Sequence, residues 1–357
     1  MAKQPKNMIK YIIKRILMMI PMLLLVLTLS WLLSYIMVLQ NLVNPVAGRL
    51  GNTLDPDIIE AELQRIGYYD PWYIQLATYF KNFFTGNWGV SYNIIRDKPV
   101  IELISEIFPK TIELMIIPII LSPIIAVKLG IASATHKDKI KDLGVRTVAI
   151  LGAGVPIFWI ADMLQRFFGH YLSNFTYGSF DIPAFFGNTP GGGNPAPPVV
   201  TGFRIIDSIL ANNQVYLWDT FMHLILPAVC ITFVSLASMT RQTRSSMLDV
   251  LNQDYIRTAR AKGVLEEDVI NKHAIRNALL PVSNLIVGGT ATALLGSFFI
   301  EVVFNYKGYG YYMVISILVG DYLVTLGLLV FATIIILSGT LIADVLYTII
   351  DPRITYT

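Results

Sequence analysis

Long stretches without a charged residue constrain this chain more than any other feature of its sequence. Residues Ile16–Leu39 contain no Asp, Glu, Lys or Arg, and about 20 apolar residues in helical form are enough to cross the hydrocarbon core of a bilayer. Segments of similar character recur along the chain: Thr111–Ala134, Arg146–Phe168, Phe221–Met239, Leu279–Phe304 and Tyr322–Ile350. We therefore predict an all-α integral membrane protein with about six transmembrane helices.

Composition points the same way. Of the 357 residues, 54% are hydrophobic and 14% are charged, whereas a soluble globular domain carries about 25% charged residues. The basic N-terminus is like that of a signal peptide, but the apolar run after it is longer than the about 7–15 residues of a signal sequence, so we predict a retained first helix. The single cysteine, Cys230, excludes an intrachain disulfide and a multi-cysteine metal site, and we interpret it as a helix-packing residue.

The distribution of Lys and Arg predicts the orientation in the membrane. Basic residues gather in the N-terminal tail and in the loops 136–142 and 241–277, whereas the loops 171–217 and 305–321 contain one each. Short basic loops stay in the cytoplasm. We therefore predict a multi-pass protein of the cell membrane with both termini in the cytoplasm.

The first outer loop has its own helical signals. Asp55 and Pro56 are typical of a helix N-cap and first helical position, and Gly67 is suited to ending that helix. Aromatic residues follow in the second half of the loop. We interpret the loop as an amphipathic hairpin lying on the outer leaflet, with direct contact to a soluble partner as the alternative.

The predicted organisation is a helical membrane core behind one leading helix. The Gly/Pro-rich stretch 187–198 has no means of forming a core and is expected to be irregular. The segments are a cytoplasmic tail (1–15), transmembrane helix 1 (16–39), an extracytoplasmic loop (40–106), a core (107–350) that contains the outer loop 171–217 and the cytoplasmic loop 241–280, and a second cytoplasmic tail (351–357).

Signals of catalysis are missing from the sequence. It contains no GxxxxGK[ST] nucleotide-binding motif, no HExxH and no GxSxG, and its four histidines have no metal-ligand spacing. We therefore expect no enzyme activity, and no metal or other cofactor bound by this chain. Ionisable residues inside the apolar segments are expected to pair between helices or to reach toward the interface: Glu113, Lys128, Asp162, His223, Glu301 and Asp344.

Other residues in these segments are candidates for a pathway or for helix packing. A proline frees backbone groups that a water-filled path tolerates, and glycines permit close helix approach. The candidates of this kind are Pro156, Trp159, Gly288, Gly289, Gly296 and Glu301.

The cytoplasmic stretch from Met239 to Pro281 is too long for a simple turn and is broken by one glycine. Asp254 is predicted to cap a short helix that runs to Lys262, and Gly263 is predicted to end it in a left-handed conformation. Geometry alone leaves two interpretations open: a helix that docks on a soluble partner, and an amphipathic helix on the membrane surface.

The nine residues Tyr255–Gly263 resemble the cytoplasmic loop of permeases of ATP-binding-cassette importers, in the dipeptide/oligopeptide (nickel) branch and its first, B-type, subunit. The general Glu-Ala-Ala-x-x-x-Gly pattern of these permeases reads Arg257-Thr-Ala259 and Gly263 here, as is typical of the branch. Two regions on the substrate side depart from it, Asn41–Pro45 and 187–198. Further matching segments are Tyr11–Arg15, Gly67–Gln75, Gly86–Ser91, Thr111–Leu114, Val155–Trp159, Phe299–Glu301, Gly308–Gly310 and Asp351–Ile354.

This resemblance implies a type I permease bundle. A second homologous permease would complete the path, two cytoplasmic ATPase subunits would use ATP and Mg²⁺, and an extracytoplasmic binding protein would deliver substrate; no nucleic acid is implied. The residues implied in coupling to the ATPases are Asp254, Tyr255, Arg257, Ala259, Arg260, Lys262 and Gly263. The substrate implied is a di- or oligopeptide, with oligosaccharides and nickel complexes as alternatives. An ion-driven secondary transporter is the alternative of another class, although no internal inverted repeat is visible.

Overall fold

The computed structural model describes residues 4–39, 55–172, 196–293, 295 and 298–350. Within these ranges the chain forms helices and no β-strand, so the all-α prediction is confirmed. Four described helices are long and apolar enough to cross a membrane: α1 (Gln4–Leu39), α5 (Val100–Thr135), α10 (Gln214–Leu251) and α16 (Tyr322–Ile350). A bent pair, α6 (Ile140–Gly154) with α7 (Ile157–Arg166), provides a fifth if it counts as one span.

The third predicted segment, Arg146–Phe168, is not one straight helix. It bends by 104° between α6 and α7, which continues into the π-helical turn η1 (Phe167–Leu172). A residue before proline is pushed out of the helical region, and Val155, which precedes Pro156, is extended, with φ −96° and ψ 131°. Pro156 therefore ends α6 and sets the start of α7.

The fifth predicted segment, Leu279–Phe304, is also divided. Helix α13 covers Ile275–Ala293 and a separate short helix, α14, covers Phe298–Val303. The single-helix prediction was therefore wrong: α14 is a separate helix, and its side chains Ile300 and Glu301 are buried. Gly296, a predicted packing residue, lies outside the described residues.

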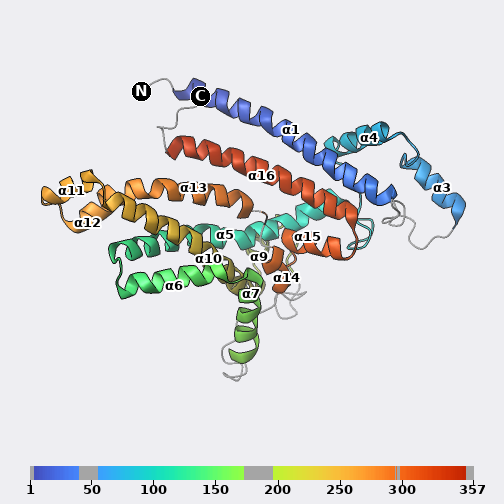
Figure 1. Ribbon diagram of the computed structural model, residues 1–357. Coiled ribbons are helices and arrows are strands. Elements are labelled where there is room, and N and C mark those ends of the chain that lie inside the picture. Colours follow the sequence, from blue (N-terminus) through green and yellow to red (C-terminus); the bar gives the residue numbers. More distant parts are fainter. Residues whose placement is uncertain (1–3, 40–54, 173–195, 294, 296–297, 351–357) are drawn as a thin grey trace.

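Short helices lie at the two ends of the bundle (Figure 1). At one end are α3 (Pro56–Arg65), α4 (Trp72–Phe84) and α15 (Tyr309–Leu318), while α9 (Arg204–Leu210) lies nearer the middle of the view. At the other are α11 (Asp254–Ala261), α12 (Glu266–Asp268) and η2 (Val269–Ala274). The first turn of α1 and the last turn of α16 lie toward the same end as α11 (Figure 1).

The helix predicted after Asp55 is present. The Asp55 carboxylate accepts a hydrogen bond from the Asp57 N–H at 3.1 Å, and Pro56 is the first helical residue. Gly67 follows the helix with a φ of +73°, a conformation that glycine adopts at little cost. The predicted N-cap and helix end are therefore both confirmed.

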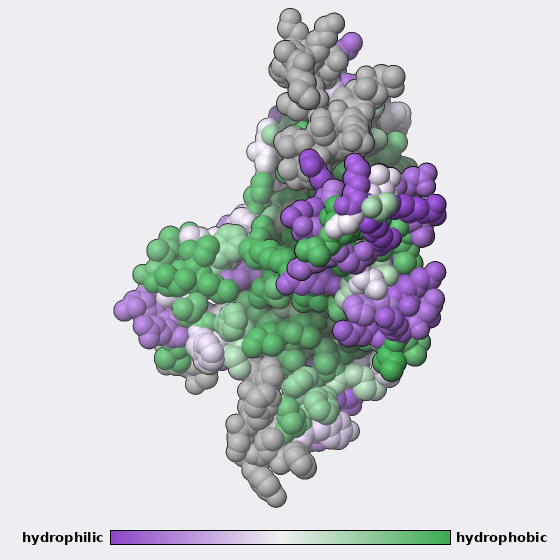
Figure 2. All heavy atoms as spheres, turned by 90° about the vertical axis from the view of Figure 1, so that its left-hand side faces the viewer, coloured by the Kyte–Doolittle hydropathy of each residue, from purple (hydrophilic) through white to green (hydrophobic). Residues whose placement is uncertain are grey.

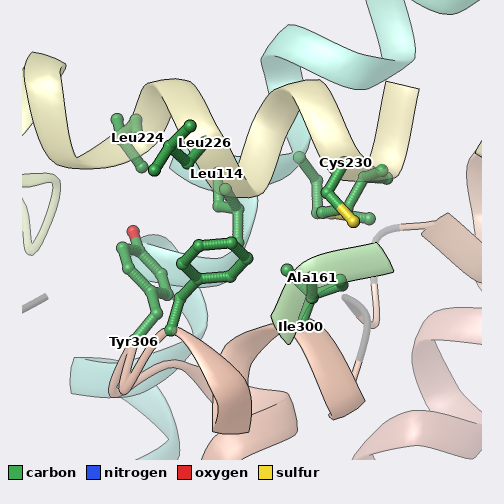
Figure 3. Packing of buried hydrophobic residues seen from close by; sticks show 10 residues of the cluster. Leu114, Ala161, Leu224, Leu226, Cys230, Ile300 and Tyr306 are labelled. Atoms are coloured by element: carbon green, nitrogen blue, oxygen red, sulfur yellow. The ribbon is translucent and has the colours of Figure 1, made fainter. Parts of the chain in front are cut away.

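A buried apolar cluster joins the long helices to the short ones. Figure 3 shows Leu114 of α5 against Leu224 and Leu226 of α10, with Tyr306 beside them. Cys230 lies in the same cluster and is fully buried and unbonded to another cysteine, so its interpretation as a packing residue is confirmed.

Candidate functional site

Helix α11 is the short helix that the sequence predicts before Gly263, with one difference at its start. The N-cap residue is Gln253, without a side-chain cap, and Asp254 is already the first helical residue. The predicted capping role of Asp254 was therefore wrong. Its carboxylate instead lies in the first turn, where a negative charge interacts favourably with the helix dipole. Arg257 Nη1 lies 3.4 Å from this carboxylate.

The end of α11 follows the prediction. Lys262 is the C-cap residue, and Gly263 has a φ of +78° with its N–H donating to the Arg260 carbonyl at 3.0 Å. A Cβ at Gly263 would meet no atom of this chain within 4 Å. The left-handed backbone, rather than crowding within the chain, is therefore what requires glycine here.

Helix α11 has one buried face and one exposed face. Ile256 and Ala259 pack into a cluster with residues at the ends of α5, α10, η2 and α13: Ala134, Met247, Val269, Ala274 and Ala278. Tyr255, Arg257, Arg260 and Lys262 are exposed. Of the residues implied in coupling, Ala259 is thus a packing residue inside the chain, and the others remain available at the surface.

Polar contacts tie the exposed face of α11 to its neighbours. Asn277 of α13 donates to the Tyr255 hydroxyl at 2.8 Å. The Arg260 guanidinium donates twice to the Glu266 carboxylate, at 2.6 and 3.0 Å, and these bonds hold the pKa of Glu266 below its usual value. Figure 2 looks onto this end of the molecule and shows hydrophilic side chains gathered in patches there.

A cavity of about 490 Å³ lies between α5, α10 and α13. Gly288 and Gly289 line it, together with polar but uncharged side chains that include Ser122, Ser235 and Asn284. A Cβ at Gly289 would meet no atom within 4 Å. Within this chain Gly289 therefore borders the cavity rather than permitting a close helix contact.

The other pathway candidates lie elsewhere. Pro156 is at the bend between α6 and α7, and Trp159, in the first turn of α7, is about half exposed. Glu301 is fully buried in α14. The structure therefore does not bring these three residues together with the cavity-lining glycines.

Glu301 belongs to a buried polar cluster built from three separate sequence motifs. The Thr111 hydroxyl donates to Glu301 Oε1 at 3.1 Å and accepts from the Tyr309 N–H at 2.7 Å. The Tyr311 N–H donates to Glu301 Oε2 at 3.1 Å. A carboxylate at the start of α15 is favourable because the first N–H groups of a helix lack partners within it. The cluster joins α5, α14 and α15.

Ionisable residues inside the apolar segments do pair. Asp344 of α16 lies 3.0 Å from Arg15 of α1. Asp162 lies 2.7 Å from Arg166 in α7, and Glu113 of α5 accepts from the Ile205 N–H of α9 at 2.6 Å. Pairing between helices is therefore confirmed for Asp344. Asp162 pairs within its own helix, and Glu113 is bonded to a backbone N–H through one oxygen while its Oε2 has no hydrogen-bond partner among the described residues.

Sequence reasoning missed Asp321, which precedes α16 and is fully buried. Its carboxylate accepts from the Ser91 hydroxyl at 2.7 Å and from the N–H groups of Tyr92 and Asn93 at 3.0 Å each. Successive N–H groups of this kind form an anion-binding concavity. Because Ser91 ends the motif Gly86–Ser91, these bonds fix the loop that contains the motif onto the start of α16. No local signal in the sequence connects the motif with Asp321.

Comparison with known proteins gives one family. The family described as binding-protein-dependent transport system inner membrane component matches residues 126–356. The dipeptide transport system permease protein DppB of Alkalihalophilus pseudofirmus is 37% identical over 88% of this chain and 90% of its own length.

Two further relatives cover the chain to a similar extent. The oligopeptide transport system permease protein AppB of Bacillus subtilis is 34% identical over 85% of this chain and 88% of its own length. The di/tripeptide transport system permease protein DppB of Pseudomonas aeruginosa is 33% identical over 91% of this chain and 94% of its own length.

Proposed function

The chain belongs to the family of inner membrane components of binding-protein-dependent transport systems, and we propose that it is the permease subunit of an ATP-driven importer of di- and oligopeptides. The transport names of its relatives support peptides over oligosaccharides and nickel complexes. In this proposal a second, homologous permease forms the other half of the path. Two cytoplasmic ATPase subunits hydrolyse ATP with Mg²⁺ as cofactor, and an extracytoplasmic binding protein supplies the substrate.

The observation that carries this proposal is the two-sided character of α11. Its exposed cations, Arg257, Arg260 and Lys262, suit an acidic groove on an ATPase, while Ile256 and Ala259 hold it on the ends of the long helices. A partner that moves α11 therefore also moves α5, α10 and α13. Because those three helices line the cavity, such a movement switches the side from which the cavity opens.

The proposed orientation places α11, the first turn of α1 and the last turn of α16 in the cytoplasm. The short basic loops 136–142 and 241–277 support this arrangement. The outer loops 40–106 and 171–217 are then available to the binding protein. The Gly/Pro-rich stretch 187–198 lies mostly outside the described residues, and its role is tested by deletion of residues 189–197, which is expected to reduce uptake.

The test is to purify the tagged chain from its native membrane in mild detergent and to identify its partners. We expect a second permease and ATPase subunits to co-purify, and Arg257→Glu to lose the ATPases but keep the second permease. Arg96→Glu, an exposed charge reversal in the outer loop, is the matched control and is expected to keep the second permease and the ATPases. A chain that is isolated alone in several detergents would contradict the proposal.

A peptide substrate is tested separately. Cells that express the complete transporter are expected to take up labelled trialanine, and unlabelled peptides are expected to compete while an oligosaccharide does not. Competition by the oligosaccharide alone would keep the importer and replace its substrate.

A further inference from the structure

A buried ion pair at the cytoplasmic end connects two helices, α6 and α10. In the proposed function both helices must move together when an ATPase moves α11. Asp142, in the first turn of α6, is fully buried. Arg244 of α10 donates from Nε to Asp142 Oδ1 at 2.8 Å and from Nη2 to Oδ2 at 2.9 Å. The Ser133 hydroxyl of α5 donates to the same Oδ1, and the Asp138 N–H donates to Oδ2 at 3.0 Å.

This arrangement is demanding in geometry. A buried carboxylate is costly unless its partner and its other hydrogen bonds are well placed. Here each carboxylate oxygen of Asp142 receives two donors, and the planar guanidinium fork of Arg244 matches the carboxylate. Arg146, one turn further along α6, lies 3.9 Å away and is about half exposed, so it adds little.

The pair lies next to α11. Arg244 is close to the end of α10 at Leu251, and α11 begins at Asp254. Met247 of α10 packs with Ile256 of α11 in one buried cluster. Movement of α11 is therefore passed directly to the last turns of α10.

Helices α5 and α10 are in direct contact at the same level. A Cβ at Gly130 of α5 would lie 2.5 Å from the Thr243 Cβ of α10, closer than real contacts allow. Interiors this dense transmit displacement rather than absorb it. Helix α6 packs against α10 as well, since a Cβ at Gly152 would lie 3.3 Å from the Ala237 Cβ. At the end near α11, the polar contacts of Asp142 join α6 to both α5 and α10.

Helix α6 leads from this end toward the opposite end of the bundle. It ends at Gly154, before Pro156, and α7 beyond the bend contributes Ala161 to the buried cluster with Ile300 of α14 (Figure 3). A displacement carried by α6 therefore reaches α7 and, through it, α14.

We propose that Asp142 and Arg244 are positioning residues that make α6 move with α10 when a partner ATPase moves α11. This inference rests on the proposed function. We call Ser133, Asp142 and Arg244 the coupling brace. Without it, α11 and α10 still respond to the ATPase, but α6 is held to α10 by helix packing alone. Helices α6 and α7 then follow less closely, and less peptide is imported for each ATP hydrolysed.

The test uses the complete importer reconstituted in liposomes, with labelled trialanine as the transported probe. Arg244→Gln is expected to assemble and to hydrolyse ATP, but the amount of peptide imported per ATP is expected to fall about tenfold. Arg244→Lys retains the charge without the fork and restores part of this ratio. Arg146→Gln removes an equal charge beside the same carboxylate and leaves the ratio unchanged. If Arg244→Gln does not assemble, Ser133→Ala, which removes one donor only, takes its place.

A second measurement does not depend on the substrate. Spin labels at Val148 of α6 and Ser245 of α10, both exposed, report the distance between the helices in the nucleotide-free and vanadate-trapped complexes. We expect one distance in both states with Arg244 present and a shift between states in Arg244→Gln.

The outcomes separate the two proposals. Import and ATP hydrolysis that fall together, in proportion to the amount of assembled complex, would make the brace a purely structural contact and overturn the inference. A distance between α6 and α10 that stays fixed in Arg244→Gln would overturn it as well. If the wild-type complex imports no trialanine, the peptide assignment fails, and the distance measurement alone decides the role of the brace.

Discussion

At the scale of single residues, Gly263 carries two separable requirements. Its φ of +78° requires a residue that tolerates the left-handed region, and its surroundings within the chain are open. Asn tolerates this region better than β-branched residues do. A docked ATPase would add a requirement of its own, namely room and the absence of negative charge among Arg257, Arg260 and Lys262.

Substitutions at Gly263 distinguish these requirements. Gly263→Asn is expected to retain most uptake. Gly263→Val is expected to lose it through backbone strain of about 1–3 kcal/mol. Gly263→Asp is expected to lose uptake through its charge while membrane insertion stays intact. Uptake assays, with the membrane level of each variant as control, check this series. Loss of uptake in Gly263→Asn would show that close approach of the partner, and not the backbone, requires glycine; normal uptake in Gly263→Asp would remove the coupling role.

Glu301 offers a prediction on stability. Its carboxylate accepts from the Thr111 hydroxyl and the Tyr311 N–H while fully buried. A glutamine cannot accept at both positions, because one of its terminal atoms is a donor. Glu301→Gln is therefore expected to destabilise the protein by about 1–3 kcal/mol.

The measurement for Glu301 is the thermal unfolding midpoint in detergent. The control is Glu102→Gln, which neutralises an exposed carboxylate of α5 and leaves the midpoint nearly unchanged. Equal midpoints for Glu301→Gln and the wild type would mean that the cluster is not a stabilising contact.

At the scale of elements, the close contact between α5 and α10 depends on Gly130, which has no side chain to separate the two helices. Gly130→Ala places a methyl group against Thr243 and is expected to cost about 1–3 kcal/mol, because a packed interface does not yield freely. Gly144→Ala, in α6, meets no atom within 4 Å. It is expected to be neutral or slightly stabilising, since alanine favours a helix over glycine.

Unfolding midpoints of the two alanine variants check this contrast. The expected order is Gly130→Ala below the wild type and Gly144→Ala at or above it. The reverse order would mean that the two helices adjust to one another, and it would weaken the case that α5 and α10 move as one body.

Elements of this fold differ in how far the sequence predicts them. The helix after Asp55 and the end of α11 follow from local rules, because capping and left-handed turns depend on neighbouring residues. Pro156 predicts a break but not the 104° bend, since the angle depends on how α7 packs. The ion pair of Asp142 with Arg244 joins residues 102 positions apart, and no local rule brings such residues together.

The candidate site was predicted to a similar degree. Tyr255–Gly263 was located through its resemblance to a family and its helical pattern, while the buried side of α11 depends on tertiary packing. Thr111, Glu301 and Gly308–Gly310 were noted as separate motifs, and only the fold shows that Thr111, Glu301 and the start of α15 meet in one cluster.

At the scale of the whole molecule, the source of energy is the remaining choice between the importer and an ion-driven carrier. An ion-coupled carrier binds its ion near the middle of the membrane, where ionisable side chains mark the path. Among the described residues, the lining of the cavity between α5, α10 and α13 consists of apolar, hydroxyl and amide side chains and contains no ionisable group.

Uptake is therefore expected to follow ATP and not the ion gradient. The test uses proteoliposomes that contain the complete transporter, with ATP supplied on the side of the membrane where the ATPases lie. Vanadate is expected to abolish trialanine uptake. A protonophore or a sodium ionophore is expected to leave the uptake unchanged. A matched preparation with the ATPases removed should show no uptake even with an imposed gradient. Uptake that survives without ATPases and disappears with the ionophore would identify an ion-driven carrier, because ATP hydrolysis by partner subunits would then supply none of the work.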